Sequence, residues 1–112
     1  MVSKELVAAS GAPLILSILS RGESYGYAII QEVRGLSGGR MQWTDGMLYP
    51  VLHRLEEQGL IRSRWGISET GRKRRYYRLR SEGGRALKDM MNQWQVVFST
   101  LMKASEGEPC AT

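Results

Sequence analysis

The sequence predicts a mainly α-helical domain with one small β-hairpin and a long C-terminal helix. Three observations support this prediction. Apolar residues recur with helical spacing in three segments before residue 60, and residues 60–79 alternate between apolar and charged side chains as strands do. A seam of regularly spaced apolar side chains then follows residue 81. With 112 residues, of which 42% are hydrophobic, the chain is long enough for one core.

The first two predicted helices are defined by the residues at their ends. Pro13 fits the first turn of a helix, because the N–H group that proline lacks would have no partner there. Residues 1–10, which precede this helix, are compatible with either a mobile arm or a short helix. Ser24 is a suitable N-cap for a second helix that extends to about Arg34. The glycine-rich segment 35–39 then forms a loop.

A third helix is predicted to begin after Thr44, whose side chain can cap it, and to end at Gly59. Its apolar side chains recur on one face, which carries Leu48, Leu52 and Leu55. Pro50 lies inside this segment, and proline removes one backbone hydrogen bond from a helix. From the apolar pattern alone we expect a kink or a break at Pro50.

Two strands and a last helix complete the predicted fold. Residues 60–65 and 74–79 alternate between apolar and polar side chains, which predicts a hairpin with a long, projecting connection. Ser81 can cap a fourth helix that extends to about Lys103. Apolar residues on this helix are spaced by four, three, four and three positions, which is the spacing of a seam between two helices. The seam contains Leu87, Met91, Trp94, Phe98 and Leu101, and Met90 and Val97 widen it.

The positive charge of the chain is concentrated in one segment. Nine basic and two acidic residues lie between Arg62 and Arg85, so this segment has a formal balance of +7. The rest of the chain, with seven basic and nine acidic residues, has a balance of −2, and the whole chain carries +5. Such a concentration of charge suits a surface that faces phosphate groups.

Several classes of function find no support in the sequence. There is no cysteine and histidine cluster for a metal, no recognisable nucleophile motif and no pair of carboxylates in an apolar setting, so we expect neither an enzyme nor a cofactor. Because no apolar run reaches the length of a membrane span, we expect no membrane partner. The only cysteine, Cys110, cannot form an intrachain disulfide, which favours the reducing environment of the cytoplasm.

The order of three helices, a hairpin and a fourth helix is that of a winged helix-turn-helix. In this arrangement the third helix enters the major groove of double-stranded DNA, and the hairpin, called the wing, lies over phosphates. We therefore predict a DNA-binding domain at residues 1–80, a C-terminal dimerisation helix at residues 81–104 and a disordered tail at residues 105–112.

The predicted DNA contacts come from the third helix and the wing. With the leucines turned inward, Tyr49 is free to donate to a phosphate or to touch a base edge, and Arg54 can reach a phosphate or a guanine. His53 can do the same or can be a solvated helix position, and the sequence leaves both open. The basic run at the root of the wing is expected to contact phosphates. The predicted DNA-binding residues are Thr44, Tyr49, His53, Arg54, Arg72, Lys73, Arg74 and Arg75.

The apolar seam on the fourth helix predicts a homodimer. A helix of about twenty residues spans roughly 30 Å, which is longer than so small a body can cover. The uncovered part needs a partner, and a two-fold dimer with the first and last helices at its interface supplies one. The predicted interface positions are Leu87, Met91, Trp94, Phe98 and Leu101. The operators of such a dimer are near-palindromic.

Three segments of the chain resemble regulators of the PadR family. They are residues 25–29 (YGYAI), residues 47–61 (MLYPVLHRLEEQGLI) and residues 71–79 (GRKRRYYRL), and the similarity covers roughly residues 5–104. Each segment alone is a weak signal, whereas their combination is specific. The resemblance implies that the third helix tolerates Pro50 and that the chain belongs to the short subgroup with a single C-terminal helix. The chain departs from the family at Arg80, where a threonine is usual.

The resemblance also implies a small-molecule effector. Short PadR-family proteins hold planar compounds in the dimer cleft, between aromatic side chains at the position of Trp94, and the flexible thioethers of Met90 and Met91 suit an adaptable wall. The simpler interpretation is that Trp94 fills space in the seam. We expect a DNA-binding repressor that a small planar or aromatic ligand releases. The alternatives are a winged-helix module that binds protein, and a metal-responsive regulator, which the shortage of histidine and cysteine disfavours.

Overall fold

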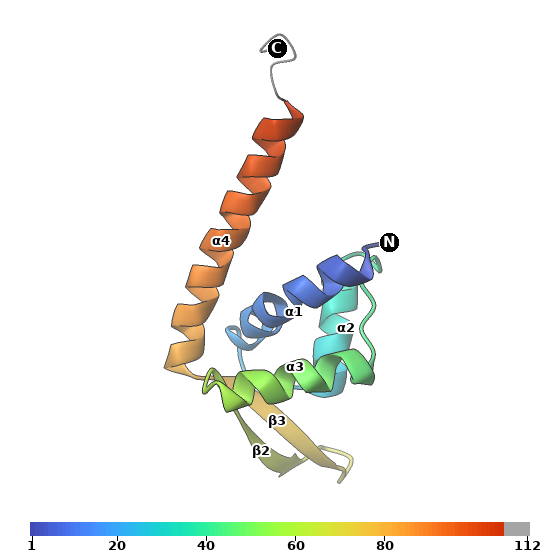
Figure 1. The fold of residues 1–112 in the computed structure, drawn as a ribbon. Coiled ribbons are helices and arrows are strands. Elements are labelled where there is room, and N and C mark those ends of the chain that lie inside the picture. The colour runs from blue at the N-terminus through green and yellow to red at the C-terminus, as the bar shows by residue number, and fades with distance from the viewer. Residues whose placement is uncertain (107–112) are drawn as a thin grey trace.

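The computed structural model describes residues 1–106 and shows a small helical body from which one long helix projects (Figure 1). The elements are α1 (Lys4–Leu19), β1 (Ser24–Tyr25), α2 (Gly26–Leu36), α3 (Asp45–Glu57), β2 (Ile61–Ile67), β3 (Lys73–Leu79) and α4 (Ser81–Ser105). The first three helices and the sheet form the body, and α4 leaves it at the corner where the hairpin begins. This order confirms the predicted mainly α-helical fold with a small hairpin and a C-terminal helix.

The core lies between the three helices of the body and the base of the sheet. Leu48, Leu52 and Leu55 of α3, which were predicted to point inward, are at most 1% exposed. They belong to one apolar cluster with Ile15 and Leu16 of α1, which are completely buried. Because this face of α3 is used for packing, only the opposite face and the two flanks of the helix are available to a ligand.

The sheet is antiparallel, with the strand order β1–β3–β2. β2 and β3 form the predicted hairpin, which pairs Ile61 with Leu79 at its base and Ile67 with Lys73 near its tip. At the base of the hairpin Ile61 and Tyr77 are buried in the core, whereas Ile67 is 75% exposed. The hairpin therefore leaves the body toward its tip and projects as a wing (Figure 1).

The predicted start of the first helix is wrong. α1 begins at Lys4, because the Ser3 hydroxyl caps it by accepting a hydrogen bond from the Leu6 N–H at 3.3 Å. Val7 is buried and anchors this early part of the helix in the core. Pro13 is consequently inside α1 rather than in its first turn. Of the two alternatives for residues 1–10, the structure has the helix.

The predicted cap of the second helix is also wrong. Ser24 lies in β1 and pairs with Tyr77 of β3, so that α2 begins only at Gly26. The helix then ends at Leu36, slightly beyond its predicted end. A strand of two residues has no local signature, because it exists only through its partner much later in the chain.

α3 is continuous through Pro50, as the family resemblance implied and contrary to the break that the apolar pattern predicted. The group that loses its hydrogen bond is the carbonyl of Gly46, four residues earlier. Gly46 and Pro50 are both exposed, so water can satisfy this carbonyl. The predicted cap of α3 is confirmed, since the Thr44 hydroxyl accepts a hydrogen bond from the Met47 N–H at 3.3 Å.

α4 is attached to the body through its first turn. Its N-cap is Arg80 and not the predicted Ser81, because the Arg80 N–H donates to the Leu60 carbonyl oxygen at 3.0 Å and keeps the chain extended up to that point. Gly83 is buried against the same carbonyl oxygen and against Leu79. A β-carbon at Gly83 would overlap with both groups, so this close contact requires glycine.

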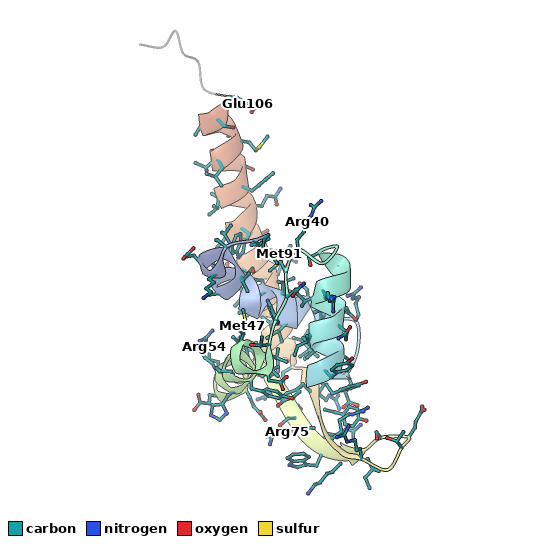
Figure 2. The ribbon with its side chains drawn as sticks, turned by 90° about the vertical axis from the view of Figure 1, so that its right-hand side faces the viewer. Arg40, Met47, Arg54, Arg75, Met91 and Glu106 are labelled. Atoms are coloured by element: carbon teal, nitrogen blue, oxygen red, sulfur yellow. The ribbon has the colours of Figure 1, made fainter. Side chains whose placement is uncertain are left out.

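The second half of α4 stands clear of the body (Figures 1 and 2). Phe98 and Leu101 of the predicted seam are 64% and 61% exposed, so a run of apolar side chains faces solvent in the single chain. The helix ends at Ser105 rather than near Lys103. Ser105 was predicted to begin the tail, and the rest of that tail from residue 107 onward lies outside the described residues.

Candidate nucleic-acid interface

The exposed part of α3 holds the four predicted DNA-binding residues of this helix in three different places. Thr44 is at the start of the helix, where its hydroxyl serves as the cap. His53 is on the outer face, 3.8 Å from the Glu57 carboxylate, and both side chains are largely exposed. Tyr49 lies on the flank toward the wing, whereas Arg54 lies on the opposite flank beside α1 (Figure 2). The structure thus brings Tyr49 and the wing together and leaves Arg54 apart from them.

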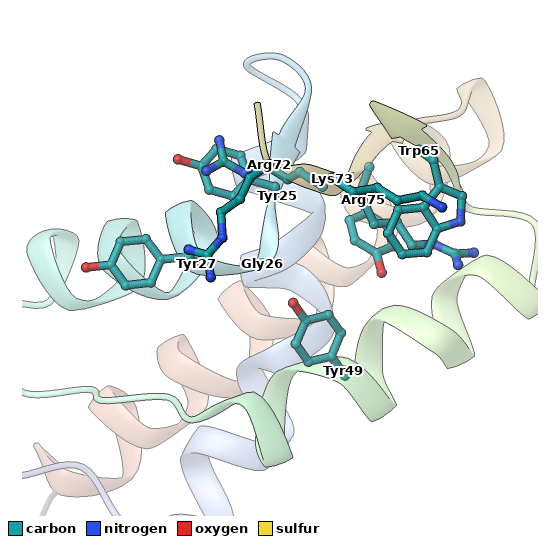
Figure 3. Close-up of a pocket in the computed structure, with 10 residues that line it drawn as sticks. Tyr25, Gly26, Tyr27, Tyr49, Trp65, Arg72, Lys73 and Arg75 are labelled. Carbon is teal, nitrogen blue, oxygen red and sulfur yellow. The ribbon is translucent and has the colours of Figure 1, made fainter. Parts of the chain in front are cut away.

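A cleft of about 780 Å³ separates α3 from the wing (Figure 3). We call it the wing cleft; its walls are residues 25–27 at the start of α2, Tyr49 of α3, and Trp65, Tyr77 and residues 72–75 of the wing. A second hollow of about 450 Å³ shares Tyr49, Arg75 and Tyr77 with the wing cleft and adds His53 and Glu56. Together they place the predicted basic run and two of the predicted α3 residues around one concave surface.

Aromatic rings hold three of the wing cations. The Arg74 guanidinium carbon lies 3.9 Å from the ring centroid of Tyr25. Lys73 Nζ and the Arg75 guanidinium carbon lie 5.0 and 5.4 Å from the ring centroid of Trp65. These cation–π contacts restrict the long basic side chains to the walls of the wing cleft. The sequence prediction missed both rings; the signal that could have found Trp65 is the hairpin register, which places it directly opposite Arg75.

Carboxylates neutralise only part of the positive segment. Arg64 donates to both oxygens of Glu23, at 2.9 and 2.7 Å, and this hydrogen bonding lowers the pKa of Glu23. Arg75 donates to the Ser63 hydroxyl at 3.0 Å and lies 3.6 Å from the Glu56 carboxylate. By contrast, Arg72 and Lys73 form no ion pair within residues 1–106. These two side chains are therefore the wing cations most available to an external anion.

Tyr49 also fixes the position of α3 relative to α2. Its hydroxyl and the adjoining ring carbon lie so close to Gly26 that a β-carbon at Gly26 would overlap with them. Gly26 is the first residue of α2, so the phenol of Tyr49 rests against the start of that helix. At 44% exposure the ring of Tyr49 is still accessible from the wing cleft.

A separate apolar hollow of about 270 Å³ lies between α1 and α4. Trp94 and Met91 form its α4 side, and Pro13 and Leu14 contribute from α1. Of the other residues predicted for the ligand site and the dimer seam, Met90 and Leu87 are partly buried against the core of the same chain. Phe98 and Leu101 are far more exposed. The structure therefore divides the predicted seam into a proximal part that packs on the body and a distal part that faces solvent.

Within residues 1–106 no three His, Cys, Asp or Glu side chains gather closely enough to hold a metal ion. Over the same residues, no helix combines the length and the apolar character needed to cross a membrane.

A helix-turn-helix with a basic wing defines the class of DNA-binding transcriptional regulators. The model of the transcriptional regulator PadR-like family matches residues 15–89, which is more than half of the chain. The protein therefore belongs to the PadR-like family of transcriptional regulators, which confirms the family predicted from the sequence. The members of this family are regulators and not enzymes.

Solved structures and a curated relative agree with this assignment. A transcriptional regulator from Clostridium thermocellum has a TM-score of 0.84 and 31% identity, covering 92% of this chain and 97% of that one. A PadR family transcriptional regulator from Eggerthella lenta has a TM-score of 0.79 and 35% identity, with coverage of 93% and 88%. The transcriptional regulator YqjI of Escherichia coli is 34% identical over 84 residues, which make up 75% of this chain but only 39% of YqjI.

Proposed function

We propose that the protein is a cytoplasmic repressor that binds a near-palindromic operator as a homodimer and is released by a small planar aromatic ligand. In this proposal α3 enters the major groove, and the wing lies over the phosphates that flank it. The observation that carries the proposal is the wing cleft, where Tyr49 of α3 and the cations of residues 72–75 line one concave, basic surface. The family membership supports DNA binding by this surface.

The homodimer is supported by the distal half of α4. Its exposed apolar side chains include Val97, Phe98, Leu101 and Met102. So many large apolar groups along one projecting helix are costly to leave in water, and a second copy of the same helix offers them a complementary seam. A two-fold axis through this seam presents two α3 helices to two half-sites of one operator.

Neutralising the free wing cations is the direct test of DNA binding through the wing cleft. We expect the double variant Arg72→Ala/Lys73→Ala to weaken binding to operator and to random DNA by similar factors. Since each lost phosphate contact releases fewer counterions, the slope of log K against log salt should fall by about 0.9 per contact. Fluorescence anisotropy on labelled duplexes between low and moderate salt measures both quantities.

The matched control removes two arginines away from the wing cleft. Arg34 and Arg40 are exposed at the far end of α2 and in the loop that follows, and Arg34→Ala/Arg40→Ala changes the net charge by the same amount. If this control flattens the salt dependence as much as the wing variant does, the effect belongs to net charge and the assignment of the wing is wrong.

The ligand part of the proposal concerns Trp94 and its neighbours Met90 and Met91. We expect a planar aromatic compound to bind once per dimer, stacked between Trp94 and its symmetry mate, and to quench the fluorescence of Trp94. Binding should lower operator affinity by no more than the ligand's differential affinity for the two states. A panel of planar aromatics is titrated into the wild type, Trp94→Ala and, as a control on the wing, Trp65→Phe. Undiminished binding to Trp94→Ala would exclude this site as the sensor.

A further inference from the structure

The start of α2 is an open helix N-terminus that faces the wing cleft. Its N-cap, Tyr25, makes no side-chain capping bond, and its first turn contains no acidic residue. The N–H groups of the first turn therefore keep their hydrogen-bonding capacity at the positive end of the helix dipole. Tyr25, Gly26 and Tyr27 all line the wing cleft (Figure 3).

A second, independent feature points to the same place. Tyr77 is only 5% exposed, yet it lines both hollows beside α3, and its hydroxyl makes no hydrogen bond within residues 1–106. Its cross-strand neighbour Ser63 donates instead to Glu56 and accepts from Arg75. Burial raises the pKa of Tyr77, so its phenol remains a protonated donor at neutral pH. The floor of the cleft thus holds a donor that lacks an acceptor.

The sheet brings these two features together. β1 pairs Ser24 directly with Tyr77, and α2 begins two residues after Ser24. The hydroxyl of Tyr49 rests against Gly26 and adds a further donor between them. Lys73 and Arg74, held by the rings of Trp65 and Tyr25, supply positive charge at the wall. The one carboxylate nearby, Glu56, is engaged by Arg75 and Ser63.

We propose that this end of the wing cleft is a binding site for a single phosphate group. The first-turn N–H groups of α2 and the hydroxyls of Tyr77 and Tyr49 donate to its oxygens, and Lys73 and Arg74 balance its charge. The inference rests on the proposed function, because the phosphate is one of the DNA backbone. Held there, it fixes the register of α3 along the major groove. Inorganic phosphate has the same chemistry and is distinguished from DNA by the experiment.

The test removes one oxygen atom. Tyr77→Phe keeps the buried ring, and because the hydroxyl has no partner in the free protein, the free energy of unfolding should not fall. Affinity for operator and for random DNA should nevertheless drop about tenfold, since a hydrogen bond to a charged group is lost. The matched control is Tyr76→Phe on the opposite face of the same strand, where the ring contacts with Tyr25 and Arg64 are retained. Its affinity should stay within about twofold of wild type.

Neutral phosphate analogues identify the partner atom. Methylphosphonate is placed at each backbone position of the operator in turn, and binding is measured for wild type and Tyr77→Phe. We expect one position per half-site where the substitution weakens the wild type but not Tyr77→Phe, which assigns that DNA phosphate to the site. In a parallel arm, inorganic phosphate is titrated against the free protein, with chloride at equal ionic strength as the reference, while the Gly26 and Tyr27 amide resonances are followed.

Each outcome decides the proposal. Coupling at one backbone position supports the site with DNA as its source of phosphate. Amide shifts that require inorganic phosphate and the Tyr77 hydroxyl, without coupling to DNA, support the site with a free phosphate as its ligand. If Tyr77→Phe binds DNA as Tyr76→Phe does and neither arm responds, the site does not exist, although the chain still binds DNA. Failure of the wild type to bind DNA at all would instead remove the proposed function.

Discussion

Phe98→Lys is expected to convert the homodimer into a folded monomer with little affinity for its operator. Phe98 is 64% exposed in the single chain and contributes nothing to the core of the body, so a lysine there leaves the body intact. In the dimer it would bring a charge into an apolar seam twice. A monomer engages one half-site at a time, and losing the second contact removes a gain in affinity of about 10²–10⁴. Sedimentation equilibrium and operator titration measure the two effects.

The helix offers a control that matches this change in chemistry and size. Val96 is 65% exposed but lies on the other side of α4, in a hollow lined by Asn92, Gln95 and other polar residues. Val96→Lys should therefore remain a dimer and bind operator as the wild type does. A dimeric Phe98→Lys at micromolar concentration would place the interface elsewhere in the molecule.

Gly83→Ala should be the most destabilising single methyl addition in the chain. A β-carbon at this position would overlap with the Leu60 carbonyl oxygen and lie 2.7 Å from Leu79 Cδ1. Neither neighbour is the free end of a flexible side chain, because one is backbone and the other belongs to the packed base of the wing. We expect the free energy of unfolding to fall by about 2–3 kcal/mol. Urea denaturation at one fixed protein concentration measures it, since the stability of a dimer depends on concentration.

The adjacent glycine provides the comparison. A β-carbon at Gly84 would meet only Leu79 Cδ2, at an ordinary distance of 3.9 Å. Because alanine has the higher helix propensity, Gly84→Ala should stabilise the protein by about 0.5–1 kcal/mol. Equal effects of the two substitutions would show that helix propensity, and not the contact with Leu60, determines the result at Gly83.

The elements with a strong local signal were predicted from the sequence, and those that depend on tertiary pairing were not. Thr44 and the leucines of α3 define a capped amphipathic helix, and the hairpin shows in its alternation. β1 escaped prediction because its two residues form a strand only beside β3. Ser24 and Ser81 are both good capping residues by type, yet tertiary hydrogen bonds keep the chain extended past one and place the other inside α4.

The candidate site was predicted in outline and incompletely in detail. The sequence indicates that α3 and a basic wing act together, and the wing cleft brings Tyr49, His53 and residues 72–75 around one surface. It gives no indication that Glu56 and Ser63 engage Arg75, because that contact depends on where α3 ends relative to the wing. The roles of Tyr25 and Tyr77 likewise depend on strand register, which sequence alone does not fix.

Leu60 joins the recognition helix to the dimerisation helix through a single peptide unit. Its N–H donates to the Leu55 carbonyl oxygen at the end of α3, and its own carbonyl accepts from Arg80 at the start of α4. Gly83 packs on that carbonyl without room for a side chain, so the two helices tilt together as one rigid lever. Trp94 lies about 20 Å along α4 from this fulcrum. A displacement of about 3 Å at Trp94 therefore corresponds to a rotation of α3 by about 10°.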